Sequence, residues 1–184
     1  PCNTFSTARN RAFVTTIRDA ERPQGIDPNR PEVREGNLIA FNTLWAAKYV
    51  ADVLGQAVSI ENPKSSYMWD YLRPWMGDIH QDANFSPCMF GGQFKKPTTI
   101  RCWNWFPSQL DNLCRKTATG FSCGRLSHPN LGFDGVPTKE AAVYEPQVCD
   151  VWSFSVDKHF KLPFRYVKVR HGLIKKDHTP QEYR

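Results

Sequence analysis

Along the chain, stretches in which apolar residues recur at helical spacing alternate with short runs of consecutive apolar residues, a pattern typical of an α/β fold. A helix is predicted from Asn37 to Leu54, because apolar residues recur there at three- and four-residue spacing and Gly55 follows as a helix stop. The short run Ala57–Ile60 predicts a buried strand, which must end at Pro63 because proline has no backbone N–H. We expect Glu61 at the carboxyl end of this strand, the edge where open α/β sheets place ligands.

Further elements are predicted on either side of this strand. Ser65 or Ser66 is expected to cap a short helix that stops at Pro74. The proline-rich segment from Asp19 to Arg34 is expected to be an exposed loop. The remaining predictions are strands over Asn84–Phe90, Thr98–Trp103 and Val151–Val156, and a helix over Pro107–Cys114.

Composition and charge divide the chain into three parts. Its 184 residues, 40% of them hydrophobic, suit a folded domain, and no apolar run approaches the roughly 18 residues that span a bilayer, so no membrane is expected as a partner. We expect an α/β domain over 1–113, an irregular, loop-rich extension over 114–157 and a basic tail over 158–184. The tail holds eight Lys or Arg against two acids, which accounts for the whole net charge of +6.

The basic tail also contains aromatic residues, a combination that suits phosphate contacts and base stacking. DNA is therefore the expected partner, with RNA as an alternative. The other interpretation is a solvated extension that only keeps the protein in solution.

The six cysteines are too few for a disulfide scaffold of this size, which favours a reducing compartment inside the cell, cytoplasmic or nuclear. No metal site is predicted. The weak candidates for metal ligands are Cys114, Cys123 and His128, whose spacing matches no tight Cys-x2-Cys knuckle.

Three short stretches contain residue types that support chemistry, and each also has a plain structural interpretation. Cys2 lies in a polar loop near Arg9, where a cation would favour its thiolate, although it could be an ordinary loop cysteine. Glu61 could act as an acid, or could only cap the next helix or pair with a lysine. The two-glycine turn before Lys95 and Lys96 could approach a ligand closely, or could be a hairpin turn with solvated lysines.

These three stretches, in this order, resemble the catalytic half of DNA (cytosine-5) methyltransferases, in a divergent methylase-like branch. The motifs are Pro-Cys-x-Thr-Phe-Ser-x-Ala-Arg from Pro1, Glu-Asn-Pro-x-x-Ser-x-x-Trp from Glu61, and a Phe-Gly turn leading through Lys96 to Thr98. The resemblance covers about residues 1–105, with a looser likeness through His128 and the stretch from Tyr144 to Cys149. It implies a Rossmann-like α/β sheet.

The resemblance also implies roles for individual residues. Cys2 would add to C6 of a cytosine swung out of the duplex, and Glu61 would protonate N3, so that C5 could accept a methyl group from S-adenosylmethionine. Arg9 would steady the loop that bears Cys2. The residues expected to contact the substrate or its phosphates are Ser6, Asn62, Lys95, Lys96 and Thr98.

The chain departs from the family pattern in several respects, among them Pro63, where a small β-branched residue is usual. Where the typical enzymes have Gln-x-Arg-x-Arg, this chain has Phe94, Lys96 and Thr98, which lose the planar fork of arginine. The Gly-rich cofactor loop and its strands would have to precede Pro1, so we expect a truncated sheet, completed by an upstream segment or a partner chain. The alternative is a methylase-derived module, from a viral or mobile-element protein, that binds nucleic acid without catalysis.

Overall fold

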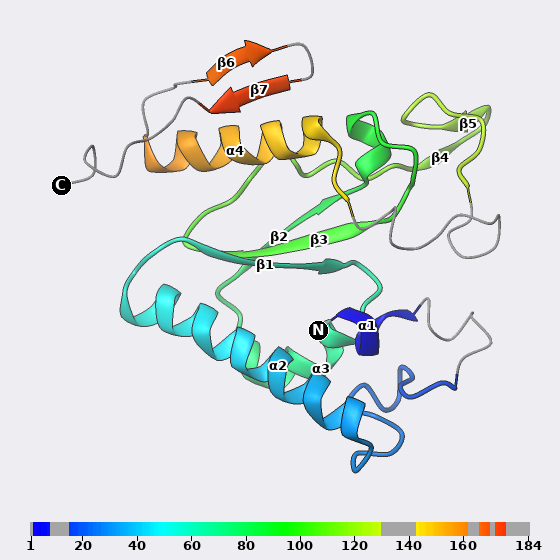
Figure 1. Cartoon of the computed structure of the whole chain (residues 1–184), viewed down its shortest axis with the longest axis vertical. Helices are drawn as coiled ribbons and strands as arrows, with labels where there is room; N and C mark the ends of the chain where they lie inside the picture. Colours follow the sequence, from blue (N-terminus) through cyan, green and yellow to red (C-terminus); the bar gives the residue numbers. More distant parts are fainter. Residues whose placement is uncertain (1, 8–14, 130–142, 162–165, 170–171, 176–184) are drawn as a thin grey trace.

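The computed structural model describes residues 2–7, 15–129, 143–161, 166–169 and 172–175. In these residues the chain is a mixed α/β fold, with a three-stranded sheet between two layers of helices (Figure 1). The sheet has the order β1–β3–β2, with β1 (Val58–Pro63), β2 (Gln81–Phe85) and β3 (Thr98–Trp103). The helices are α1 (Cys2–Phe5), α2 (Pro31–Lys48), α3 (Tyr67–Met76) and α4 (Pro146–Phe160), with a π-helical turn η2 (Tyr49–Val53) and a 3-10 turn η3 (Pro87–Phe90). Two hairpins pair β4 (Lys116–Thr117) with β5 (Gly120–Phe121) and β6 (Tyr166–Val169) with β7 (Gly172–Lys175).

Strand β3 lies between β1 and β2 and runs antiparallel to both. Strands β1 and β2 therefore point in the same direction, and their last residues, Pro63 and Phe85, both lie opposite Thr98. We call this end of the sheet the carboxyl edge. The expected α/β class is confirmed. Neighbouring strands of a Rossmann sheet are parallel, whereas the described strands pair only in antiparallel fashion.

Helices α1, α2 and α3 cover one face of the sheet and form what we call the helical layer (Figure 1). Helix α2 turns Ala40, Leu44 and Ala47 toward this core at the spacing of one helix face. Helix α3 adds Leu72 and Met76, both buried. Removing apolar side chains from water is therefore the main force that holds this layer to the sheet.

Helix α2 begins at Pro31, six residues before its predicted start at Asn37. Proline suits the first helical position, because the N–H that it lacks would have no partner there. Not all of the apolar residues that predicted this helix are buried, since Trp45 remains 56% exposed. Four exposed apolar residues of α2 and of the η2 turn that continues it form what we call the α2 stripe: Leu38, Trp45, Tyr49 and Val53.

The strand, turn and helix around the Glu-Asn-Pro motif follow the prediction except at the far end. Ser66 is the helix cap, because its Oγ accepts a hydrogen bond from the backbone N–H of Met68 at 3.2 Å. The prediction that this helix stops at Pro74 is wrong. Helix α3 continues to the buried Met76 and ends at Gly77, whose φ of 70° few other residues adopt.

Two predicted elements in the middle of the chain are corrected. The strand expected over Asn84–Phe90 ends at Phe85, and a 3-10 turn follows because Pro87 cannot donate to a strand ladder. The helix expected over Pro107–Cys114 is absent from this described segment, which forms a turn and then runs beside the end of β2. There the carbonyl of Asn112 accepts a hydrogen bond from the backbone N–H of Ser86 at 3.1 Å.

The strand expected over Val151–Val156 is a helix, α4, which covers the other face of the sheet (Figure 1). Val148, Trp152 and Val156 recur at four-residue spacing and pack into this core, so a helical period explains the pattern better than alternation does. The extension over 114–157 is therefore not irregular throughout, because α4 occupies its last part. Within the described ranges, no helix combines the length and the apolar character that a bilayer crossing requires.

Candidate functional site at the carboxyl edge

Glu61 lies in β1 close to the carboxyl edge, and its carboxylate is held by a tyrosine from a distant part of the chain. The preceding residue, Ile60, packs into the helical layer, so Glu61 points to the opposite face of the sheet. There the hydroxyl of Tyr144 donates a hydrogen bond to Oε1 of Glu61 at 2.5 Å. The Nζ of Lys96 lies 5.4 Å from the centre of the Tyr144 ring. A carboxyl group, a phenol and an ammonium group therefore meet at this edge.

Helix α1, which contains Cys2, is attached to the same end of β1. The Oγ of Ser66 donates to the carbonyl of Phe5 at 3.4 Å, and the hydroxyls of Thr7 and Ser65 are 3.0 Å apart. These contacts bring α1 and the following Ser6 to the turn after Pro63. The side chain of Cys2 and the whole of Arg9 lie outside the described residues.

A buried arginine, Arg18, joins α1 to the rest of the helical layer. It is only 1% exposed, and its guanidinium stacks on the ring of Phe5 at 3.8 Å. It donates hydrogen bonds to the carbonyls of Thr4, Pro23 and Val33 at 2.7–3.2 Å, and to Oδ1 of Asn37 at 2.8 Å. Burial lowers the pKa of Arg18 to about 10, with a smaller opposing effect of Tyr71, so the side chain stays charged at neutral pH.

Two residues predicted to contact the substrate are engaged inside the fold. The hydroxyl of Thr98, which is fully buried, donates to the carbonyl of Lys96 at 3.1 Å. Asn62 is also buried, and its Nδ2 lies 3.0 Å from the sulfur of Met68. The amide nitrogen of Asn62 therefore contacts α3 inside the fold.

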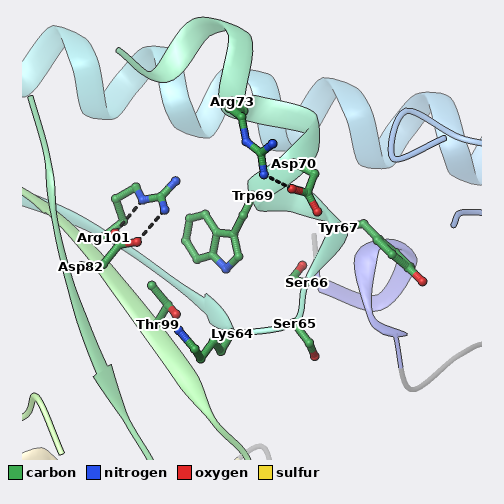
Figure 2. Close-up of a pocket in the computed structure, with 10 residues that line it drawn as sticks. All are labelled: Lys64, Ser65, Ser66, Tyr67, Trp69, Asp70, Arg73, Asp82, Thr99 and Arg101. Atoms are coloured by element: carbon green, nitrogen blue, oxygen red, sulfur yellow. Dashed lines mark hydrogen bonds and ion pairs between the residues drawn. The ribbon is translucent and has the colours of Figure 1, made fainter. Parts of the chain in front are cut away.

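A polar hollow opens beside the carboxyl edge, between α3 and the strands (Figure 2). Arg101 forms two hydrogen bonds with the carboxylate of Asp82, at 2.7 and 2.6 Å, and its guanidinium lies 4.7 Å from the ring of Trp69. Arg73 pairs with Asp70 on the rim. The indole N–H of Trp69 donates to the carbonyl of Pro63 at 3.0 Å, which fixes the wall of the hollow to the end of β1.

On the other side of the edge, three cysteines and a histidine converge. The metal-ligating atoms of Cys88, Cys114, Cys123 and His128 all lie within 4.8 Å of one another. His128 Nε2 is 3.3 Å from the sulfur of Cys123 and 4.0 Å from that of Cys114. The structure thus unites the three weak metal candidates of the sequence and adds Cys88, which follows β2.

The surroundings set the protonation of this cluster. Burial raises the pKa of Cys114, but hydrogen bonds from the backbone and thiol of Cys123 and from Cys88 and Ser122 outweigh burial, so the pKa is lowered. Burial and the hydrogen bond with Cys114 raise the pKa of Cys88. Burial, together with nearby cations, lowers the pKa of His128. These shifts favour the thiolate form of Cys114 and the neutral form of the His128 imidazole.

The loop Gly91–Lys96 is packed against this cluster. Arg125 donates to the carbonyl of Gly92 at 3.1 Å, and the Nζ of Lys95 lies 5.0 Å from the ring centre of Phe121. The ring of Phe121 in turn meets the ring of His128 edge to face, with centres 4.4 Å apart. The two lysines predicted as binding residues thus lie between the cluster and Tyr144.

Sequence reasoning did not identify Tyr144, Arg18 or Cys88 as site residues. Tyr144 is 83 residues from Glu61 along the chain, and Cys88 is 26 residues from Cys114, so neither local spacing nor a motif links them. Among the predicted site residues, Glu61, Ser6, Lys95 and Lys96 gather at the carboxyl edge. Comparisons with protein-family models, curated proteins and solved structures found no match to this chain.

Proposed function

We propose that this chain is the base-binding and nucleophile-bearing part of a DNA (cytosine-5) methyltransferase-like protein. The observation that carries the proposal is the carboxyl edge itself, where Tyr144 holds the carboxylate of Glu61 on one face of the sheet and α1, the helix of Cys2, is attached through Ser66 on the other. A base that meets both groups would lie across the end of β1. In open parallel sheets, ligands and catalytic groups lie at the carboxyl ends of the strands, and here β1 and β2 share such an end. The ordered motifs that resemble the family place a cysteine and a glutamate in these two positions.

In the proposed chemistry, Cys2 and Glu61 act on one flipped-out cytosine. The Cys2 thiolate forms a bond to C6, the C5–C6 π electrons move into the ring, and the protonated Glu61 gives its proton to N3. Tyr144 occupies Oε1 and leaves the other carboxyl oxygen for the base. C5 then becomes nucleophilic and can take a proton from water. Loss of the original C5 hydrogen and departure of the thiolate restore cytosine, with Glu61 recovering its proton from N3.

Cations around the edge support a nucleic acid as the substrate. Lys64 is exposed at the turn after β1, with its Nζ 2.9 Å from Oδ1 of Asn84, and Lys95 and Lys96 lie beyond β2. The hollow of Figure 2 adds Arg73 and Arg101 at its wall, paired with Asp70 and Asp82. Cationic side chains at such positions contact phosphates and so orient a duplex over the site.

The described residues do not fit the cofactor that the family uses. A Gly-rich turn that opens a helix after a strand is the usual cradle for such a cofactor. Here β1 leads to α3 through Pro63 and Ser66, and Gly91 and Gly92 lead back toward β3. We therefore assign no step of S-adenosylmethionine chemistry to the described part of the chain.

In this proposal an upstream segment or a partner chain supplies the cofactor site. Strand β1 forms one end of the β1–β3–β2 order, and in the described residues no other strand pairs with its outer edge. The α2 stripe, on the helix that packs beneath β1, leaves large apolar side chains in water. Further strands added to β1, with a helix over the α2 stripe, would extend this sheet toward a Rossmann-like arrangement.

The test is exchange of the cytosine C5 hydrogen, which needs no methyl donor. The whole polypeptide of the reading frame is incubated with duplex DNA that contains [5-³H]cytosine, and release of tritium to water is measured. We expect release from the wild type and at least a 100-fold loss in Cys2→Ala and in Glu61→Gln, the lower range for acid–base residues. Tyr144→Phe should retain activity at a reduced rate, because Tyr144 acts only by positioning Glu61. Release that persists in Cys2→Ala would refute the proposal.

A second function, nucleic-acid binding without catalysis, is favoured by the exposed Arg115 and Lys116 at the start of the β4–β5 hairpin and by the basic tail, whose side chains beyond Lys161 lie outside the described residues. DNA or RNA affinity would then fall steeply with salt, and deletion of 158–184 would reduce the slope by about one unit for each lost phosphate contact. Cys2→Ala and Glu61→Gln would leave that affinity intact. Unchanged binding after the deletion would count against this function.

A further inference from the structure

We propose that Cys88, Cys114, Cys123 and His128 bind one structural Zn²⁺ ion. Their ligand atoms, three sulfurs and one ring nitrogen, lie within 4.8 Å of one another. Tetrahedral zinc with ordinary bond lengths separates a sulfur from a nitrogen ligand by about 3.6 Å. The observed separations of His128 Nε2 from the sulfurs of Cys123 and Cys114, 3.3 and 4.0 Å, lie on either side of that value.

The ligand set points to zinc rather than to a hard cation. Three thiolates and an imidazole are soft to borderline donors, which disfavours Mg²⁺ and Ca²⁺. Four protein ligands close a tetrahedron and leave no position for substrate, so the site is structural and not catalytic. This inference is independent of the proposed methyltransferase chemistry, because none of the four residues takes part in it.

The segment that contributes most of the ligands buries few apolar side chains. Strands β4 and β5 are two residues each, and both residues of β4 are exposed. A short two-stranded hairpin is marginal in water unless something else anchors it. The ligands bracket the hairpin: Cys114 precedes β4, whereas Cys123 and His128 follow β5. Gly124, with φ of 86°, makes the sharp turn after Cys123.

The fourth ligand connects this hairpin to the sheet. Cys88 lies in η3, directly after β2, so an ion held by all four residues would fasten the hairpin to the carboxyl edge. The hairpin and the residues after it also contact the loop that contains Lys95 and Lys96. Arg125 donates to the carbonyl of Gly92, and Lys95 lies over the ring of Phe121. We therefore expect the ion to fix the position of Lys95 and Lys96.

The experiment measures the zinc content of the purified protein by inductively coupled plasma mass spectrometry. We expect one zinc per chain in the wild type and in Cys149→Ser, which removes an exposed cysteine of α4 outside the cluster. Cys114→Ser and Cys123→Ser should lose most of the metal. Cys88→His exchanges one ligand for another, so the site keeps four ligands and should keep the ion.

A spectroscopic readout keeps the test independent of folding yield. With Co²⁺ in place of zinc, the wild type should show thiolate-to-cobalt charge-transfer absorption, and Cys88→His should show a weaker band because one thiolate is lost. The proposal is overturned if the wild type holds no metal, if Cys149→Ser loses as much as Cys114→Ser, or if Cys114 and Cys123 are found joined by a disulfide.

Discussion

The helical layer and the β4–β5 hairpin flank the same edge of the sheet, yet different forces hold them. The layer buries Leu44, Leu72 and Met76 almost completely, whereas the hairpin leaves both residues of β4 in water. What the hairpin has instead is a cluster of four potential ligands at its base. The difference teaches that one side of the site is built by the hydrophobic effect, which is distributed over many residues, and the other by a few specific contacts.

The largest expected effect comes from two neighbours on α2. Leu44 is 1% exposed and Trp45 is 56% exposed. Leu44→Ala should lower the free energy of unfolding by about 2–5 kcal/mol, because it leaves a cavity in the helical layer. In residues 1–184 alone, Trp45→Ala should cost far less, at most about 0.5–1.5 kcal/mol for its ring contact with Phe41. Urea unfolding of both variants measures the contrast, and equal losses would show that the α2 stripe is covered in the protein.

A somewhat smaller effect is expected from Arg18→Met. The change leaves the carbonyls of Thr4, Pro23 and Val33 without their buried donor, at a cost of about 3 kcal/mol. Limited proteolysis should then cut first near α1, because Arg18 joins that helix to α2. The matched control is Arg22→Met, which breaks only an exposed pair with Asp19 and should be nearly neutral. If the Arg18→Met protein were as stable as that control, Arg18 would not be what holds α1 to α2.

The helical layer was easier to predict from the sequence than the contacts around the hairpin and Glu61. The helix that became α2, the strand that became β1 and the cap at Ser66 were predicted because apolar spacing and capping are local signals. The helix α4 was predicted as a strand, because over a few residues alternation and helical spacing coincide. The cluster with Cys88 and the bond from Tyr144 to Glu61 depend on residues far apart in the chain, which no local pattern links.

The smallest effect on global stability, and the most local, should follow metal removal. A strong chelator should release the β4–β5 hairpin and expose the backbone amides of 114–128 and 91–96 to hydrogen exchange. The amides of α2 and α3 should keep their protection, because apolar burial holds them. Hydrogen-exchange mass spectrometry with and without chelator measures both regions at once. Loss of protection across the helical layer would contradict the separation of the two regions.

The most direct test of the carboxyl edge as a reactive site is covalent capture of Cys2. A duplex with 5-azacytosine offers a C6 that the thiolate can attack while ring nitrogen N5 takes up a proton, so the adduct forms without a methyl donor. We predict an adduct in the wild type and in Cys149→Ser, mapped by peptide mass spectrometry to Cys2, and at least 100-fold less adduct in Glu61→Gln. An adduct that maps to another cysteine, or that forms equally well in Cys2→Ser, would contradict the account.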